Sequence, residues 1–259
     1  MQAESYNHVH VGSTDPAKYL IVNADDFGQS HGINRGIITA FREGIVTSTS
    51  LMVRWPAAAE ASAYSRKHPG LSVGLHIDLG EKIFRAGEWV PIYTVVTLQS
   101  ETAIRDEISR QLAEFDRLVG HAPTHLDSHQ NVHLREPVRS ILTEIARRLS
   151  VPLRHCSAEI TFRGNFYGQT AAGTPLSGAI SVDGLIQILG ALPAGCTELG
   201  CHPAAQCDFY TMYRDERRDE LKVLCDPRVR AALKRMGIGL RSFADLSHIR
   251  EQSVSAGPT

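Results

Sequence analysis

Short apolar runs rich in β-branched residues alternate along this chain with stretches whose apolar residues recur at helical spacing. The first run, residues 19–25, is apolar without strict alternation, which is typical of a strand covered on both faces. It is followed by Ile33, Ile37 and Phe41 at steps of four residues, as on one face of a helix. Repeated β-α units of this kind imply a parallel sheet, so we expect one barrel-like or doubly wound α/β domain.

The alternation continues along most of the chain. Further strands are predicted at 47–53, 71–77, 123–129, 151–155, 197–203 and 238–242. Helices are predicted after Ser30 and at 56–68, 101–119, 136–149, 182–191, 214–224 and 227–236. Residues 78–100, which contain Gly80, Gly87 and Pro91, are predicted to be a long loop, and residues 157–180 a loop or an insertion. Loops of this length often cover active or binding sites.

Charge and cysteine content narrow the classes of partner. The 259 residues include 27 Lys and Arg against 28 Asp and Glu, so no basic field favours nucleic acid or an anionic membrane. No apolar run reaches the roughly 18 residues of a membrane span, and the first residues lack the pattern of a secretory signal. Five cysteines are odd in number and few for a disulfide scaffold. We therefore expect a cytoplasmic protein with a small-molecule ligand, and we allow for a homodimer.

Flexible tails at 1–17 and 251–259 are predicted to flank a single domain at 18–250.

Polar residues follow several of the predicted strands at their carboxyl ends. In a parallel sheet these ends meet at one edge, where such proteins carry their sites. The residues concerned are Asp25, Asp26, His76, Asp127, His129, His133 and His202. Because each group ends a different strand, residues far apart in the sequence are predicted to converge on one rim.

One carboxylate with two imidazoles is a common ligand set for a divalent ion that keeps a position open for water. We assign Asp26, His76 and His129 as such a triad. The alternatives are purely structural: an Asp caps the following helix, and His76 is a hydrogen-bonded core residue. Two imidazoles favour Zn²⁺ or another transition metal over Mg²⁺, which prefers oxygen ligands.

Four further residues have more open interpretations. His125 and His133 flank His129 at steps of four residues, but Pro123 argues against a helix there, so they are predicted to support the site or contact substrate. Asp127 either orients one of the imidazoles or caps the next helix. Arg154 ends another strand and either pairs with Asp25 or forms an ordinary surface ion pair.

Five motifs occur in order along the chain. They are NADDFG (23–28), GIVTSTSLMV (44–53), VGLHIDL (73–79), PTHLDSHQNVH (123–133) and CHPA (201–204). Together they resemble the YdjC-like carbohydrate deacetylase family, which includes the chitooligosaccharide deacetylases, over residues 18 to 246. The resemblance implies a TIM-barrel-like (β/α) fold related to the NodB-type polysaccharide deacetylases. It also implies a divalent metal, Mg²⁺ by family association, and hydrolysis of an N-acetyl group from an amino sugar.

The resemblance also implies roles for particular residues. Asp26, His76 and His129 match the family's metal ligands, while by analogy Asp25 is the base and His202 the acid that protonates the departing amine. The sequence departs from the usual family pattern at Asn131, where a further histidine often stands. Aromatic residues in predicted loops, among them Trp89 and Tyr167, would suit stacking on sugar faces, although most are expected to serve packing.

Two other functions compete with N-deacetylation. One is metal-dependent hydrolysis of another bond such as a phosphoester, and it is weakened because no basic clamp lies near the motifs. The other is a carbohydrate-binding protein without catalysis, which is weakened because every proposed catalytic group is present. Release of acetate from N-acetylglucosamine oligomers would separate these functions.

Overall fold

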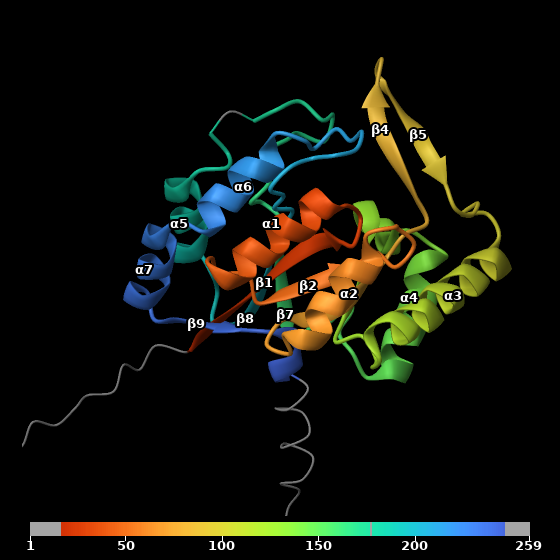
Figure 1. Ribbon diagram of the computed structural model, residues 1–259, viewed down its shortest axis with the longest axis horizontal. Helices are drawn as coiled ribbons and strands as arrows, with labels where there is room; N and C mark the ends of the chain where they lie inside the picture. Colours follow the sequence, from red (N-terminus) through yellow and green to blue (C-terminus); the bar gives the residue numbers. More distant parts are fainter. Residues whose placement is uncertain (1–16, 177, 247–259) are drawn as a thin grey trace, which may run out of the picture.

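A parallel sheet forms the centre of the computed structural model, which describes residues 17–176 and 178–246 (Figure 1). Its strands are β1 (Lys18–Phe27), β2 (Ser48–Leu51), β3 (Ser72–Ile77), β6 (Leu126–Ser128), β7 (Ile160–Arg163), β8 (Gly195–Cys201) and β9 (Ile238–Arg241). They lie in the order β6-β3-β2-β1-β8-β7, and β9 also pairs with β1. All the pairings within this sheet are parallel. The predicted α/β architecture with a parallel sheet is therefore confirmed.

The sheet is a half-barrel rather than the closed ring of a TIM barrel. Among the described residues, β6 and β7 are the two ends of the strand order and do not pair with each other. The segment predicted as a strand at 151–155 makes only an isolated bridge, between Leu153 and Leu126. The side chain of Arg154 extends across this gap, with its guanidinium carbon 4.9 Å from the centre of the Phe162 ring. A buried cation with its partners occupies the place where backbone pairing would close a barrel.

Helices flank the sheet (Figure 1). Apolar residues of the sheet and of the helices form one buried core. The helices are α1 (His31–Arg42), α2 (Ala58–Lys67), α3 (Glu101–Val119), α4 (Val138–Leu149), α5 (Val182–Gly190), α6 (Glu216–Leu224) and α7 (Pro227–Arg235), with a 3₁₀ helix η1 (His129–Leu134). Their ends follow local chemistry. The Ser30 hydroxyl accepts a hydrogen bond from Ile33 N and caps α1, and Gly120 ends α3 with a φ of 88°.

The stretch predicted as a long loop contains an antiparallel hairpin. It is formed by β4 (Gly80–Arg85) and β5 (Glu88–Thr94), and it projects beyond the sheet (Figure 1). Ala86 and Gly87 make its two-residue turn with φ values of 52° and 89°. The sequence signal was weak because alanine is uncommon at such a position and most of the strand residues are partly exposed. The predicted loop at 157–180 likewise contains a short strand, β7.

Two further expectations concern the ends of the chain and membranes. The predicted tails lie outside the described residues except for Ala17, and so does the predicted end of the domain at 250. Within the part that the structure describes, no helix is both long enough and apolar enough to cross a membrane.

Candidate metal centre and active site

A cavity of about 250 Å³ opens where β1, β3, β6 and β8 end. The hairpin, η1, the loops before and after β7 and the loop before α6 complete its walls. Its lining consists of Asp25, Asp26, His76, Glu81, Lys82, Trp89, Ser128, His129, Gln130, Asn131, Arg154, Phe162, Gly164, Tyr167, Gln169, Gly200, His202, Thr211, Met212, Tyr213 and Arg217. Of the seven residues predicted to converge on one rim, Asp25, Asp26, His76, His129 and His202 line the cavity, whereas Asp127 and His133 do not.

A bulge near the end of β1 brings both of its aspartates to the cavity. The pairing of β1 with β2 shifts register between Ala24 and Phe27, and Asp26 has a φ of 70°. Aspartate is one of the few residues that tolerate this left-handed conformation. On a regular strand the two carboxylates would point to opposite faces, whereas the bulge lets both line the same pocket.

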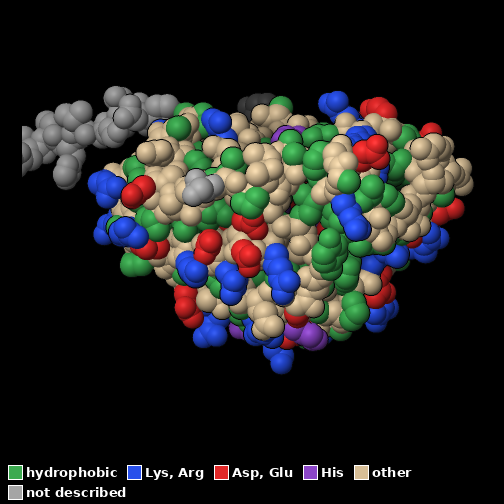
Figure 2. Space-filling view, turned by 90° about the horizontal axis from the view of Figure 1, so that it is seen from above, with side chains coloured by type: hydrophobic (Ala, Val, Ile, Leu, Met, Phe, Trp, Pro, Cys, Tyr) green, Lys and Arg blue, Asp and Glu red, His purple; other side chains and the backbone are tan. Residues whose placement is uncertain are grey.

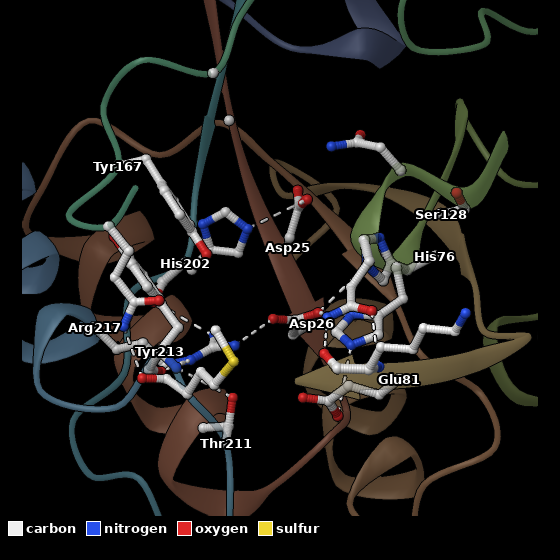
Figure 3. A pocket seen from close by; sticks show the side chains of 18 of the residues that line it. Asp25, Asp26, His76, Glu81, Ser128, Tyr167, His202, Thr211, Tyr213 and Arg217 are labelled. Carbon is white, nitrogen blue, oxygen red and sulfur yellow. Dashed lines mark hydrogen bonds and ion pairs between the residues drawn. The ribbon is translucent and has the colours of Figure 1, made fainter. Parts of the chain in front are cut away.

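The three predicted metal ligands lie together. Asp26 Oδ1 is 3.3 Å from His76 Nε2 and 3.1 Å from His129 Nδ1. One ligand atom from each residue lies within 4.8 Å of the others, and all three side chains are buried. Figure 3 shows Asp26 between Arg217 on one side and His76 with Glu81 on the other. This geometry can hold a small cation.

His76 is oriented by groups on the far side of its ring. Its Nδ1 donates a hydrogen bond to Asp127 Oδ1 at 2.8 Å and lies 3.2 Å from the hydroxyl of Ser50. Nε2 is therefore the nitrogen that faces Asp26. A carboxylate that fixes the tautomer of an imidazole in this way is the usual partner of a histidine ligand. Of the two interpretations of Asp127 left open by the sequence, the structure has the one in which it orients an imidazole.

Arg217 and Glu81 belong to the site although the sequence did not single them out. Arg217 Nη2 donates to Asp26 Oδ2 at 2.6 Å, and Glu81 Oε2 lies 3.6 Å from His129 Nε2. Arg217 stands in a densely charged segment, which is typical of a solvated helix face, yet it is only 3% exposed. Glu81 lies in the stretch that was predicted as a loop. Neither residue lies in a local sequence pattern that indicates a functional site.

Asp25 is held by a buried arginine. Arg154 donates from both terminal nitrogens to the two carboxylate oxygens, at 2.6 and 2.7 Å, and Asn23 Nδ2 donates at 2.9 Å. Burial raises the pKa of Asp25, but the charge and hydrogen bonds of Arg154, together with the charge of His76, lower it overall. Arg154 also forms an ion pair with Glu198. Burial raises the pKa of Glu198 to about 7. The surface ion pair considered for Arg154 is therefore wrong, because its side chain is 2% exposed.

His202 lies on the other side of Asp25. Its Nε2 is 3.8 Å from Asp25 Oδ2 (Figure 3). Its Nδ1 is 3.8 Å from Glu220 Oε1. The rings of Tyr167 and Tyr213 stack on each other at 4.2 Å, and each meets the His202 ring edge-on at 5.5 Å. A quarter of the His202 side chain is exposed, so a substrate in the cavity can reach it.

Opposite charges dominate the electrostatics of the triad. Burial alone would raise the pKa of Asp26, but Arg217 and hydrogen bonds from the two imidazoles hold it well below its usual range. Burial lowers the pKa of His129, but Asp26 and Glu81 raise it to about 9. The carboxylates of this cluster therefore favour positive charge at the position of the imidazoles.

His125 and His133 lie outside the cavity lining. His125 stacks on Phe243 with the ring centres 3.8 Å apart, and His133 Nδ1 is 2.7 Å from the hydroxyl of Ser128. Burial lowers the pKa of each to about 4. Neither imidazole lines the cavity itself, but His133 contacts the lining residue Ser128 from behind.

An α/β half-barrel with carboxylate and imidazole groups gathered at its strand ends defines a class of hydrolase-like proteins, and comparison with known proteins identifies the family. The sequence profile of the YdjC-like protein family matches residues 19–235. The chain belongs to the YdjC-like family. It is 34% identical to a chitooligosaccharide deacetylase from Serratia marcescens, with 88% of this chain and 99% of the relative covered. It is 32% identical to a carbohydrate deacetylase from Geobacillus stearothermophilus, with 88% and 98% covered.

Solved structures agree with this assignment. A candidate cellobiose-phosphate cleavage protein from Enterococcus faecalis V583 superposes with a TM-score of 0.71 at 26% identity, covering 89% of this chain and 99% of that one. The family 4 carbohydrate esterase from Streptomyces lividans, solved with acetate, gives a TM-score of 0.53 at 15% identity, covering 87% and 93%. The second likeness concerns the fold alone.

Proposed function

We propose that this protein is a metal-dependent carbohydrate N-deacetylase, which hydrolyses the N-acetyl group of an amino sugar in an oligosaccharide or glycoconjugate. The observation that carries the proposal is the buried triad Asp26, His76 and His129 beside Asp25, in a family whose curated relatives are named carbohydrate and chitooligosaccharide deacetylases. An uncharged sugar also suits the surface, because acidic and basic side chains are interspersed over the face shown in Figure 2.

The residues present fit a divalent cation. One carboxylate and two imidazoles offer ligand atoms within 4.8 Å of one another, and His129 Nε2 is buried without a hydrogen-bond partner among the described residues. A bound divalent ion would supply Lewis acidity, polarising the acetamide carbonyl and acidifying water. Two nitrogen ligands favour a transition metal such as Zn²⁺, whereas the family resemblance favours Mg²⁺.

Asp25 is placed to act as the general base. The paired Arg154 keeps its carboxylate ionised at neutral pH, and one of its oxygens faces His202 across the cavity. In this role Asp25 takes the proton of the attacking water, and Arg154 holds the carboxylate in one orientation through its two hydrogen bonds.

His202 is placed to act as the general acid. The tetrahedral intermediate expels amine only when the nitrogen is protonated, so an acid is needed on the side opposite the base. His202 stands across from Asp25, with Glu220 on its other nitrogen and two tyrosines fixing its ring. Proton transfer of this kind typically contributes about 100-fold to 10,000-fold.

A phosphoester substrate is the competing proposal, and the charges in the cavity disfavour it. The two buried arginines, Arg154 and Arg217, are both committed to aspartates and so do not form a phosphate clamp. Assaying acetate and phosphate release side by side separates the two reactions.

Two variants test the assignment of roles. Asp25→Asn is expected to bind metal like the wild type and to lose at least about 100-fold in acetate release from N-acetylglucosamine oligomers, because the base is removed while the triad remains. His129→Ala is expected to lose both metal binding and activity. Metal content and acetate release are measured on the same preparations. Unchanged turnover of Asp25→Asn would remove the base assignment.

The cellular setting is part of the same proposal. All five cysteines are free thiols, as expected in the reducing cytoplasm. We propose a cytoplasmic enzyme, acting as a monomer or a homodimer.

A further inference from the structure

Trp89 lines the cavity and yet leaves 48% of its surface exposed. It stands directly after the hairpin turn and pairs across the strands with Phe84, whose ring meets it edge-on with centres 5.7 Å apart. An indole in this position presents a large apolar area to water. Covering it with a ligand is favourable, because each Å² of apolar surface removed from water contributes roughly 25 cal/mol.

The hairpin that carries Trp89 is fixed on both sides of the cavity. On one side Lys82 N donates to Gln130 Oε1 at 2.9 Å, and Gln130 Nε2 donates to Lys82 O at 2.7 Å. On the other side Phe84 N donates to Met212 Sδ at 2.9 Å. Gln130 has a φ of 51°, a strained conformation for such a residue, and its side chain makes this link. The platform is therefore held in place before any ligand binds, which lowers the cost of binding.

The cavity is small for a substrate of more than one ring. Its volume of about 250 Å³ is below the usual range of ligand pockets, which starts at roughly 300 Å³. The catalytic groups lie at the strand ends, so further rings must extend outward from them. Trp89 is an exposed residue of the cavity wall that such a ring can meet.

We propose that Trp89 is the platform of an outer subsite, which binds the pyranose ring next to the one that carries the scissile acetamide. This inference rests on the proposed deacetylase function. A pyranose has an apolar face of C–H groups and a rim of hydroxyls, and it matches an exposed indole in a cavity that is also lined by the polar side chains of Lys82 and Asn131. The enzyme therefore prefers oligomers to the single amino sugar.

Kinetics on substrates of different length test the subsite. Full-length enzyme is assayed for acetate release from N-acetylglucosamine and from its β-1,4-linked trimer. In Trp89→Ala the ratio of kcat/KM for trimer over monomer is expected to fall about tenfold, through KM for the trimer. Trp89→Phe keeps a ring and is expected to lose less than about threefold. Ile92→Ala is the matched control, because Ile92 is exposed on the same hairpin and does not line the cavity.

Two kinetic outcomes would overturn the subsite. One is an unchanged ratio in Trp89→Ala, which would leave the exposed indole to some other partner, such as a protein. The other is an equal loss on monomer and trimer, which would mean that the indole only supports the hairpin.

A binding measurement separates failure of the subsite from failure of the proposed reaction. The chain has two tryptophans, and Trp55 is packed against Tyr93 and Phe209. Titrating Asp25→Asn with the trimer is expected to change the tryptophan emission, and the change is expected to vanish when Trp89→Phe is added. If the emission changes but the wild type releases no acetate, the subsite is supported and the deacetylase function is contradicted. If the wild type releases acetate but the emission does not change, the deacetylase function is supported and the subsite is contradicted.

Discussion

At the residue scale, Arg217 connects the two halves of the candidate site. Its guanidinium donates to Asp26 Oδ2 at 2.6 Å, to Tyr213 O at 2.9 Å and to His202 O at 3.5 Å. The proposed metal ligand, the proposed acid and the loop that carries Tyr213 therefore share one buried cation. Arg217 holds Asp26 so that its other oxygen faces the two imidazoles.

This positioning role predicts how metal affinity responds to substitution. Arg217→Met and Arg217→Lys are both expected to weaken metal binding by about 10-fold to 100-fold, because each removes the guanidinium that donates to Asp26, Tyr213 O and His202 O at once and so orients Asp26. Affinity is measured by competition with a chelator. If Arg217 contributed only charge, the Met variant would bind a cation more tightly and the Lys variant would be unchanged, which would contradict the account. Arg218→Met, at an exposed neighbour paired with Asp215, is the control.

The sequence predicted the strand-end residues of the site better than their partners. Asp25, Asp26, His76, His129 and His202 could be found because a parallel sheet gathers its strand ends at one edge. Arg217 and Glu81 could not, since each lies in a segment whose charges look solvated until tertiary packing covers them. Their roles, like those of the triad, remain predictions that the variants test.

At the element scale, close packing at the centre of the sheet encloses a neutral histidine. The ring of His125 lies so near Gly74 of β3 that a Cβ added there would be 2.4 Å from it, and its other face stacks on Phe243. Burial lowers the pKa of His125 to about 4. The unfolded chain, with an ordinary histidine pKa near 6.5, therefore binds a proton more readily than the folded one between pH 6.5 and 4.

This difference predicts a loss of stability in acid. Between pH 7 and pH 5, His125 alone is expected to remove about 2 kcal/mol from the free energy of unfolding. His125→Phe keeps the stacking on Phe243 and is expected to reduce the loss by that amount, as measured by urea unfolding at the two pH values. The exposed His121→Phe is the control. A His125→Phe variant that loses as much stability as the wild type would contradict this explanation.

Most elements could be predicted from sequence, and the exceptions have physical reasons. Helix α3 matches its predicted range of 101–119 because it has a serine cap, a clear apolar face and a terminal glycine. The hairpin β4–β5 was missed because its strands are half exposed and lack a clear alternation. The strand predicted at 151–155 was wrong in that only Leu153 pairs, since Arg154 there turns into the half-barrel.

At the scale of the whole molecule, the open edge of the half-barrel and the active site depend on each other. Arg154 fills the gap between β6 and β7 and binds Asp25, Asp127 and Glu198 at 2.6 to 2.9 Å. A closed barrel would pack apolar side chains in this place. The same buried guanidinium thus joins carboxylates of β1, β6 and β8 and holds the proposed base, so the fold and the chemistry share one network.

The residues that the structure describes offer two places for a cation, and these differ in the groups that already bind their carboxylates. The first is formed by Asp26, His76 and His129, and the second by Asp25, His76 and Asp127. Arg154 already donates to both carboxylates of the second group. The first group is therefore the predicted metal centre.

The most direct test is anomalous X-ray scattering from crystals of the protein grown with Zn²⁺ or Co²⁺. One anomalous peak is expected, bounded by the carboxylate of Asp26 and the imidazoles of His76 and His129. A peak among Asp25, His76 and Asp127, or none near His76, would contradict the central claim that this triad binds the catalytic metal.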